Sequence, residues 1–257
     1  MTILHAIVFG IVEGFTEFLP ISSTGHLILT ADLLGIVQGS FVKSFAIAIQ
    51  LGAILAVLCL YGKSLVTDVR IVKRILVAFI PTAVIGALSY AFIKRFLLGN
   101  VQVVLWALLA GGVAIILFEL LHGEKKDAVD SIPSMTYVQS LLIGAFQSFA
   151  MIPGVSRAAA TIVGGLLVGL KRKTIVEFSF LLAVPTMLAA TAFDLFKSAN
   201  GFGANHLVVL SVGFLTSFIV ALFAITFFLK FVKNHTFLVF GFYRIAIVVV
   251  YVLFFLK

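Results

Sequence analysis

Two acidic residues stand in an apolar stretch near the N-terminus, where charge is costly. Glu13 and Glu17 are four positions apart, so in a helix their side chains lie on one face. Two carboxylates in such a segment need something cationic between them. A divalent cation, Mg²⁺ or Ca²⁺, takes oxygen ligands and would fit there. A proton shared by the two groups, or an ion pair with Arg157 or Arg244, would also explain them.

Hydroxyl side chains and an imidazole follow the glutamates, directly after Pro20. They are Ser22, Ser23, Thr24 and His26. At a break in a helix, such a set could supply a nucleophile and a group that moves its proton. Ser and Thr are also ordinary helix N-caps, and a lone His is often a packing residue. The closeness of His26 to the two glutamates favours the functional interpretation.

A second break carries the opposite charge. Gly154 precedes Ser156 and Arg157, and Thr161 follows among small residues. A helix N-terminus after a glycine turn presents free backbone N–H groups and the positive end of the helix dipole, which bind anions. The planar guanidinium of Arg157 suits phosphate oxygens. This break therefore predicts a phosphate site.

Arg244 is a second arginine inside an apolar segment. Because an arginine at membrane depth is a candidate functional residue, Arg244 is also expected to bind phosphate, together with the hydroxyl groups of Ser22 and Thr24. A structural bridge from Arg244 to Gln147 or to a carboxylate is the alternative interpretation.

The composition indicates which solvent surrounds these groups. Of the 257 residues, 62% are apolar and 11% are charged, and the mean hydropathy is +1.25. A soluble domain carries about 25% charged residues because water must hydrate its surface, so this chain is predicted to lie in lipid. The net charge is +8, but the basic residues form short clusters between apolar stretches. That distribution is typical of membrane topology, and no nucleic-acid partner is expected.

Apolar stretches long enough to cross a bilayer alternate with interrupted ones. A crossing needs about 20 apolar residues, whereas the regions 3–37 and 137–170 are each broken by a proline- and serine-bearing turn. Each half is short, so the simplest interpretation is a hairpin of two half-helices that enters and leaves on one side; two kinked complete helices are the alternative. The six predicted spans are approximately 45–62, 75–93, 101–121, 174–196, 206–229 and 236–256.

The two interrupted regions resemble each other, which predicts a duplication. At offsets of 134 and then 133, the following residues align: Gly10, Glu13, Phe15, Pro20 and Ser23 with Gly144, Gln147, Phe149, Pro153 and Ser156. The chain is therefore predicted to be one membrane domain, 1–257, made of two repeats of about 1–121 and 136–257. Three crossings per repeat turn the second repeat upside down. The predicted fold is an all-α integral membrane protein, an inverted repeat of six transmembrane helices and two re-entrant helical hairpins.

Basic residues are unequally divided between the two sides of this arrangement. Eleven fall on one side and five on the other, with Arg157 and Arg244 inside the membrane. The richer side is expected to be cytoplasmic, which predicts a multi-pass protein of the cytoplasmic (inner) membrane with both chain ends on the outer face. The five on the poorer side are Lys43, Lys94, Arg95, Lys197 and Lys257.

Residues 13–26 and 153–161 resemble the two signature motifs of the undecaprenyl-pyrophosphate phosphatase family, the bacitracin-resistance type. The resemblance covers essentially the whole chain. The second motif departs from the family pattern at Ala158, where the family usually has Ser. The resemblance implies a membrane hydrolase that removes the terminal phosphate of a prenyl pyrophosphate lipid at the outer face of the membrane. Its product serves cell-wall synthesis, and bacitracin resistance follows because the antibiotic sequesters the pyrophosphate.

The resemblance also implies dependence on a divalent cation, here expected on Glu13 and Glu17. Arg157, with neighbouring hydroxyl and N–H groups, is expected to grip the phosphates. Ser23 is the expected nucleophile, with His26 moving the proton. Attack by a water that His26 or a glutamate activates is the other scheme.

A transporter or lipid flippase is the alternative function, because inverted repeats with broken helices are typical of transporters. A carrier would need neither the carboxylate pair nor the clustered Ser and His. The sequence does not specify the preferred prenyl length or the oligomeric state, and a homodimer is one state that it leaves open.

Overall fold

The computed structural model describes residues 1–37, 39–93, 97, 100–124, 127–197 and 204–255. This part of the chain is helical, with one isolated β-bridge between Val129 and Leu170, as the sequence predicts. The helices are α1 (Ile3–Thr16), α2 (Ser23–Leu33), α3 (Ser40–Thr67), α4 (Val69–Phe92), α5 (Val101–Leu121), η2 (Ile132–Ser134), α6 (Tyr137–Ser148), η3 (Phe149–Met151), α7 (Arg157–Leu167), α8 (Arg172–Lys197), α9 (Ala204–Phe231) and α10 (Leu238–Phe254).

Within the described residues, five helices are long and apolar enough to cross a membrane, so the chain is a multi-pass membrane protein. The sixth predicted span is present as α10, but it has 17 residues and falls short of the roughly 20 that a crossing needs. The five are Phe41–Thr67, Val69–Ser89, Val101–Leu121, Arg172–Ala192 and His206–Phe231.

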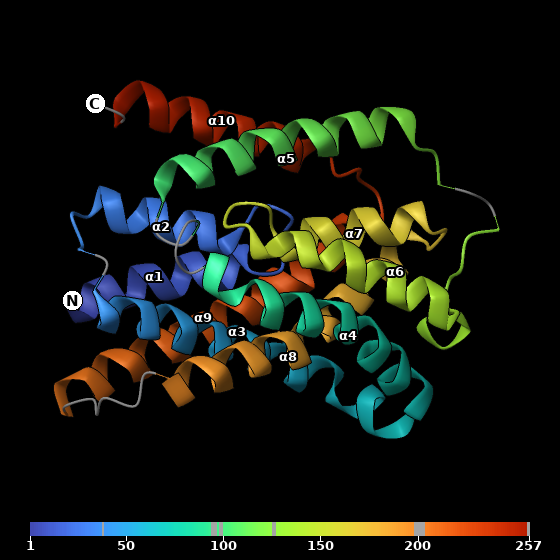
Figure 1. The fold of residues 1–257 in the computed structure, drawn as a ribbon, viewed down its shortest axis with the longest axis horizontal. Coiled ribbons are helices and arrows are strands. Elements are labelled where there is room, and N and C mark those ends of the chain that lie inside the picture. The colour runs from blue at the N-terminus through green and yellow to red at the C-terminus, as the bar shows by residue number, and fades with distance from the viewer. Residues whose placement is uncertain (38, 94–96, 98–99, 125–126, 198–203, 256–257) are drawn as a thin grey trace.

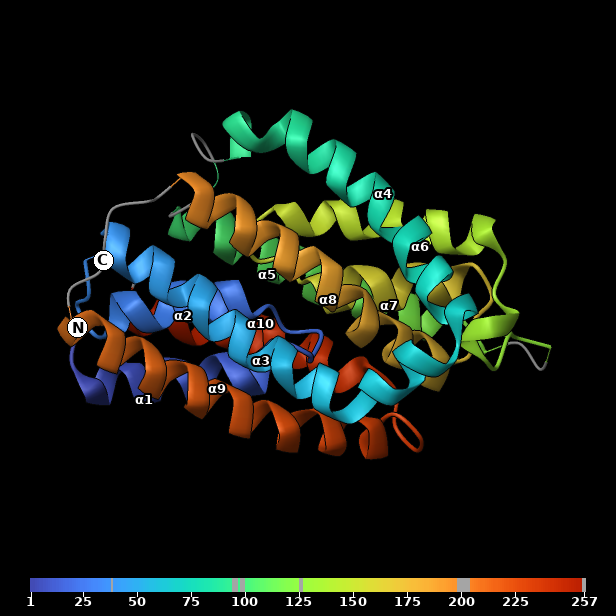
Figure 2. The same cartoon turned by 90° about the horizontal axis from the view of Figure 1, so that it is seen from below.

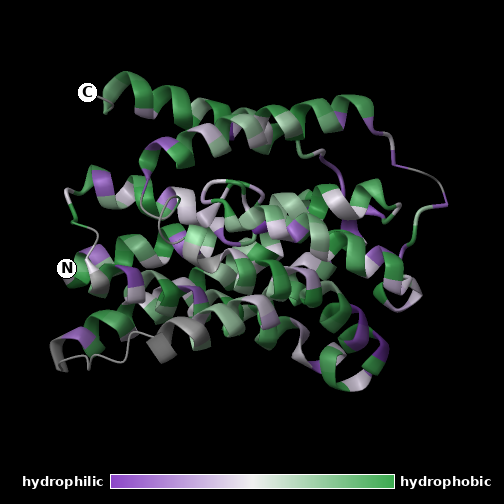
Figure 3. Cartoon of the chain, in the orientation of Figure 1, coloured by the Kyte–Doolittle hydropathy of each residue, from purple (hydrophilic) through white to green (hydrophobic). Residues whose placement is uncertain are grey.

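Large apolar side chains cover the outward faces of these helices. Trp106 on α5 is 71% exposed and Phe223 on α9 is 72% exposed, and the long helices are hydrophobic over most of their length (Figure 3). Such a surface is unfavourable in water and stable against lipid tails. Of the basic residues used to assign the two sides, the following lie outside the described residues or have side chains that do: Lys94, Arg95, Lys125, Lys126, Lys197 and Lys257.

Each interrupted region forms two short helices that fold back on each other. In Figure 1, α1 and α2 have their outer ends on the left, α6 and α7 have theirs on the right, and the two turns meet between them. The first helix of each pair, α1 or α6, begins with a capping box, at Thr2 and at Thr136. In a capping box, the side chains of two residues three positions apart each form a hydrogen bond with the other's backbone. The long helices surround the two pairs (Figure 2).

Each first half-helix packs against a long helix from the other half of the chain. Gly10 on α1 lies against α9 so closely that a Cβ at Gly10 would stand 2.7 Å from the carbonyl oxygen of Gly213. Gly144 on α6 lies in the same way against the Ala78 carbonyl of α4. Because only glycine allows this approach of two backbones, these two positions fix where the half-helices sit.

Candidate active site

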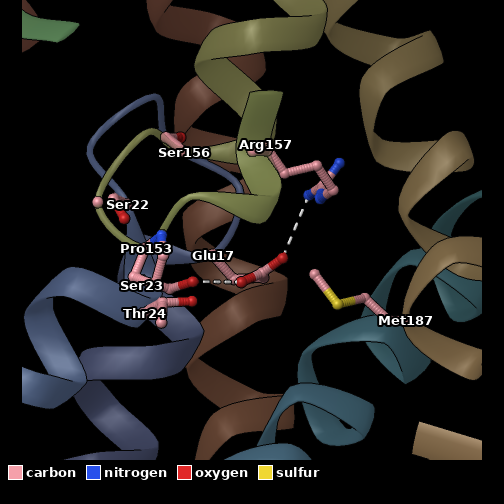
Figure 4. Close-up of a pocket in the computed structure, with 10 residues that line it drawn as sticks. Glu17, Ser22, Ser23, Thr24, Pro153, Ser156, Arg157 and Met187 are labelled. Atoms are coloured by element: carbon pink, nitrogen blue, oxygen red, sulfur yellow. Dashed lines mark hydrogen bonds and ion pairs between the residues drawn. The ribbon is translucent and has the colours of Figure 1, made fainter. Parts of the chain in front are cut away.

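The turns of the two hairpins meet and enclose a small pocket, to which α8 adds Met187 (Figure 4). The two breaks therefore lie together in the structure, although they are more than a hundred residues apart in the sequence. The pocket is lined by Glu17, Ser22, Ser23, Thr24, Ala150, Pro153, Gly154, Ser156, Arg157 and Met187.

Both turns end in a serine with the same unusual backbone conformation. Ser22 has φ 71° and Ser156 has φ 78°, a region that costs a residue with a Cβ. Each hydroxyl accepts a hydrogen bond from the N–H three residues on, Gly25 at 3.3 Å and Ala159 at 3.2 Å, so each serine caps its helix. The structural equivalent of Ser156 is thus Ser22. The pairing of Ser156 with Ser23, drawn from sequence, is wrong by one residue because it followed the prolines rather than the caps.

Glu17 connects the two turns. Its Oε2 accepts a 2.5 Å hydrogen bond from the Ser23 hydroxyl, and its Oε1 lies 3.3 Å from Nη2 of Arg157. All three side chains are buried. A buried ion pair contributes little net stability because both charges lose their hydration. A role in the reaction therefore explains the Glu17–Arg157 pair better than a contribution to folding stability does.

Arg157 has both used and unused donors. Its Nη1 donates to the carbonyl oxygen of Ser179 at 2.7 Å, and the Ser179 hydroxyl lies 2.7 Å from that of Thr161. Its Nε–H is buried without a hydrogen-bond partner, which leaves this donor available for an anion. Ser179 positions both Arg157 and Thr161, and the sequence did not single it out because it is one hydroxyl within a long apolar helix.

Glu13 lies one helical turn before Glu17 and is fully buried, and neither of its carboxylate oxygens has a hydrogen-bond partner. Orphaned oxygens of this kind are costly in a protein interior. They fit an oxygen-seeking divalent cation shared with Glu17. The described residues offer no cluster of three or more acidic, histidine or cysteine ligands. Substrate phosphate and water would therefore supply the rest, which is the usual arrangement for Mg²⁺.

His26 is buried beside the turn and does not line the pocket. Its Nδ1 lies 2.7 Å from the Ser22 carbonyl oxygen, and its Nε2 lies 2.8 Å from the hydroxyl of Tyr243 on α10. The Ser23 hydroxyl points to Glu17 instead. The geometry therefore favours Glu17 over His26 as the acceptor of the Ser23 proton.

Arg244 joins three segments through their backbones. Its guanidinium donates to carbonyl oxygens on α5 and on both turns, and the side chain is fully buried. Because five N–H groups meet five acceptors, no donor remains for a phosphate. The geometry thus favours a positioning role, close to the structural alternative, although the partners are neither Gln147 nor a carboxylate. The acceptors are Ala107, Leu108, Pro20, Gly154 and Val155.

Seven of the eleven predicted site residues line the pocket, and the other four lie behind it. Ala158, the departure from the family motif, is buried in an apolar cluster, where a hydroxyl would need a partner. The four behind the pocket are Glu13, His26, Thr161 and Arg244. The last three form hydrogen bonds with backbone carbonyl oxygens of the turns or of the helix that follows, those of Ser22, Arg157 and Pro20 respectively.

This architecture defines a polytopic, all-helical membrane protein with a buried site of carboxylate, hydroxyl and guanidinium groups between two helix-breaking turns. The family model described as bacitracin resistance protein BacA matches residues 6–250. The chain therefore belongs to this family.

Several curated relatives match over nearly their whole length. An undecaprenyl-diphosphatase of Aquifex aeolicus (strain VF5) is 54% identical over 256 residues, which covers 100% of both chains. One of Sulfurihydrogenibium sp. (strain YO3AOP1) is 53% identical over 253 residues, 98% of this chain and 99% of the relative. One of Wolinella succinogenes is 49% identical over 251 residues, 98% of this chain and 97% of the relative.

Proposed function

We propose that this chain hydrolyses undecaprenyl pyrophosphate to undecaprenyl phosphate and inorganic phosphate, which recycles the lipid carrier of cell-wall synthesis and confers bacitracin resistance. Family membership and the name of the relatives, undecaprenyl-diphosphatase, support this activity. The observation that carries it is the contact of one buried carboxylate, Glu17, with both Ser23 and Arg157. A proton acceptor, a hydroxyl and a phosphate-binding cation are the groups that phosphoanhydride cleavage needs.

The phosphates bind between the two helix N-termini. Both α2 and α7 begin at the pocket, and the first N–H groups of a helix lack partners within it, so the two dipoles add at one place. The free Nε–H of Arg157 provides a charged hydrogen bond. Ser22, Thr24, Gly154 and Ser156 line the same space, which surrounds the phosphate oxygens with donors as their charge redistributes.

Glu13 and Glu17 hold a divalent cation, Mg²⁺ or Ca²⁺, beside the phosphates. The two unpartnered Glu13 oxygens support this assignment. A cation there offsets phosphate charge and polarises the phosphoryl oxygens. It also relieves the cost of burying two carboxylates one turn apart.

Ser23 is the nucleophile in the first of two schemes. Its proton passes to Glu17 Oε2, to which the hydroxyl already donates at 2.5 Å, while the oxygen attacks the terminal phosphorus and the anhydride bond breaks, so undecaprenyl phosphate leaves and the phosphoryl group is on Ser23. Water then cleaves this phosphoserine, which releases inorganic phosphate and restores the Ser23 hydroxyl. In the second scheme Glu17 takes the proton from a water that attacks directly, and Ser23 only orients the carboxylate. In either scheme Arg157 offsets negative charge, because its Nη2 lies 3.3 Å from Glu17 Oε1 and its Nε–H is free for a phosphate oxygen.

The proposal includes an inverted repeat of six transmembrane helices and two re-entrant hairpins, with about 1–121 and 136–257 as the repeats. Reciprocal packing supports it: α1 lies against α9 of the other half, α6 lies against α4, and α5 pairs with α10. Such an exchange is expected from a pseudo-two-fold axis in the membrane plane. The excess of basic residues on one side supports the assignment of that side as cytoplasmic, and the resemblance to the family implies a site that opens to the outer face of the cytoplasmic membrane.

Phosphate release tests the activity. Purified protein in detergent, given undecaprenyl pyrophosphate and Mg²⁺ or Ca²⁺, should release inorganic phosphate, and Arg157→Lys should reduce turnover by at least about a hundredfold because lysine lacks the planar fork. Arg70→Lys is the matched control, because Arg70 forms an exposed ion pair with Asp68 far from the pocket. No turnover by the wild type with either cation, together with movement of the lipid across vesicles, would replace the hydrolase by a flippase.

A further inference from the structure

Tyr243 holds the imidazole of His26 in one defined state. The two rings are stacked, with centroids 5.6 Å apart and planes within 5°, and the Tyr243 hydroxyl lies 2.8 Å from Nε2. The opposite nitrogen, Nδ1, lies 2.7 Å from the carbonyl oxygen of Ser22. Both ring nitrogens therefore have a partner, and the ring cannot flip without losing both bonds.

These partners determine which nitrogen carries the proton. A carbonyl oxygen only accepts, so Nδ1 must be protonated in order to donate to Ser22. In the neutral imidazole, Nε2 then has a lone pair, and the Tyr243 hydroxyl donates to it. The Ser22 carbonyl thus sets the tautomer, and Tyr243 stabilises it by donating to Nε2, the nitrogen that faces away from the turn.

Tyr243 covers the Nε2 side of His26. His26 is 7% exposed, whereas Tyr243 is 41% exposed, and its hydroxyl occupies the basic nitrogen. The imidazole therefore cannot turn away from Ser22 without breaking the Tyr243 hydrogen bond.

We infer that Tyr243 is a positioning residue of the proposed phosphatase reaction, which acts through His26 by holding the imidazole so that its Nδ1–H stays on the Ser22 carbonyl oxygen of the turn. The inference rests on the proposed function. Its neighbour Arg244 holds the two turns through their carbonyl oxygens, so consecutive residues of α10 position the backbone of the site and its imidazole.

A double-mutant cycle tests the inference with undecaprenyl pyrophosphate as substrate. Tyr243→Phe keeps the stacked ring and removes only the hydroxyl, so kcat should fall about tenfold while KM stays within about twofold. His26→Ala should lower kcat by about a hundredfold, the scale of a misplaced reacting group, because the hydrogen bond to the Ser22 carbonyl of the turn is lost. In the double variant, Tyr243→Phe should cause no further loss, because residues that act as one unit are not additive.

Tyr251→Phe is the matched control. Tyr251 is on the same helix and also donates a hydrogen bond, to Asp32 of α2, but it does not touch His26 or the pocket. This variant should keep the wild-type kcat. An unchanged kcat in Tyr243→Phe, or losses that multiply in the double variant, would show that the hydroxyl does not act through His26.

The tautomer gives a measurement that needs no turnover. In ¹⁵N spectra of the histidine-labelled wild-type protein, the signals that disappear in His26→Ala belong to His26, and they should show a protonated Nδ1 and an unprotonated, hydrogen-bonded Nε2. A protonated Nε2 in the neutral ring would overturn the inference even in an active enzyme. A wild type that releases no phosphate refutes the proposed function itself, and with it the role of Tyr243 in that reaction.

Discussion

The turn between α1 and α2 and the turn between α6 and α7 share one backbone conformation around Ser22 and Ser156, but they present different groups to the pocket. The residue that opens the following helix is Ser23 in the first and Arg157 in the second. Both of these contact the same carboxylate, Glu17. The shared backbone conformation thus places the Ser23 hydroxyl and the Arg157 guanidinium at equivalent positions, where the hydroxyl can react with a phosphate and the guanidinium can bind it.

The two hairpins also differ at Glu13, one helical turn before Glu17, and at its counterpart Gln147 on α6. Gln147 donates to the hydroxyls of Thr82 at 2.8 Å and of Thr186 at 3.2 Å, so its amide joins α6 to α4 and α8. Glu13 has no such partners. One hairpin therefore uses this position for packing, while the other leaves a charge that requires a ligand.

Glu17 is the carboxylate that both turns contact, through Ser23 and Arg157, so its replacement should have the largest effect on turnover. Glu17→Gln removes both the acceptor for the Ser23 proton and the charge opposite Arg157, so kcat should fall about a thousandfold or more. Glu177→Gln is the control, since Glu177 is a partly exposed carboxylate near Lys173 on α8. Equal turnover in the two variants, measured as phosphate release, would remove Glu17 from the mechanism.

Ser23→Ala distinguishes the two schemes within the first turn. If Ser23 forms a covalent bond to phosphorus, kcat should fall by about two to three orders of magnitude. Thr24→Ala, which removes the neighbouring hydroxyl, should lose far less. Near-normal turnover of Ser23→Ala would leave direct attack by water as the mechanism.

Glu13→Gln makes the first hairpin resemble the second at this position. Loss of one carboxylate ligand should raise the concentration of Mg²⁺ or Ca²⁺ needed for half-maximal turnover by at least about tenfold. Saturating cation should restore much of the rate. Gln147→Asn provides the comparison, because it shortens a packing amide on the equivalent helix. A cation requirement that Glu13→Gln leaves unchanged would contradict the metal assignment.

Substitutions of the cap residues Ser22 and Ser156 should have the smallest effect. They test whether the two turns share the same backbone strain. Ser156→Ala loses the hydrogen bond to Ala159 and keeps the strained φ, so the free energy of unfolding should fall by about 1 kcal/mol. Ser156→Gly loses the same bond but tolerates positive φ, so it should cost less. The pair Ser22→Ala and Ser22→Gly should behave alike in thermal unfolding. If the order differs between the two turns, the backbone strain is not shared.

Much of this site could be predicted from the sequence because unusual residues in an apolar chain are conspicuous. Charged Glu13, Glu17 and Arg157 stand out where lipid penalises charge, and a proline with serines marks a helix break wherever it occurs. Ser179 could not be predicted in the same way. A single serine in a long apolar helix usually bonds within its own helix, so only the contacts of Ser179 with Arg157 and Thr161 reveal its role.

The sequence by itself determined the solvent, the broken segments and the chemical types of the site residues, because composition, apolar length and proline act locally. The tertiary structure decided which partners these residues have. Glu17 meets Arg157 across 140 positions, Arg244 bonds to backbone carbonyls, and His26 bonds to Tyr243 rather than to Ser23. Hydrogen bonds are short and directional, so the partner of a side chain depends on how distant helices pack, and residue spacing along the chain does not encode that packing.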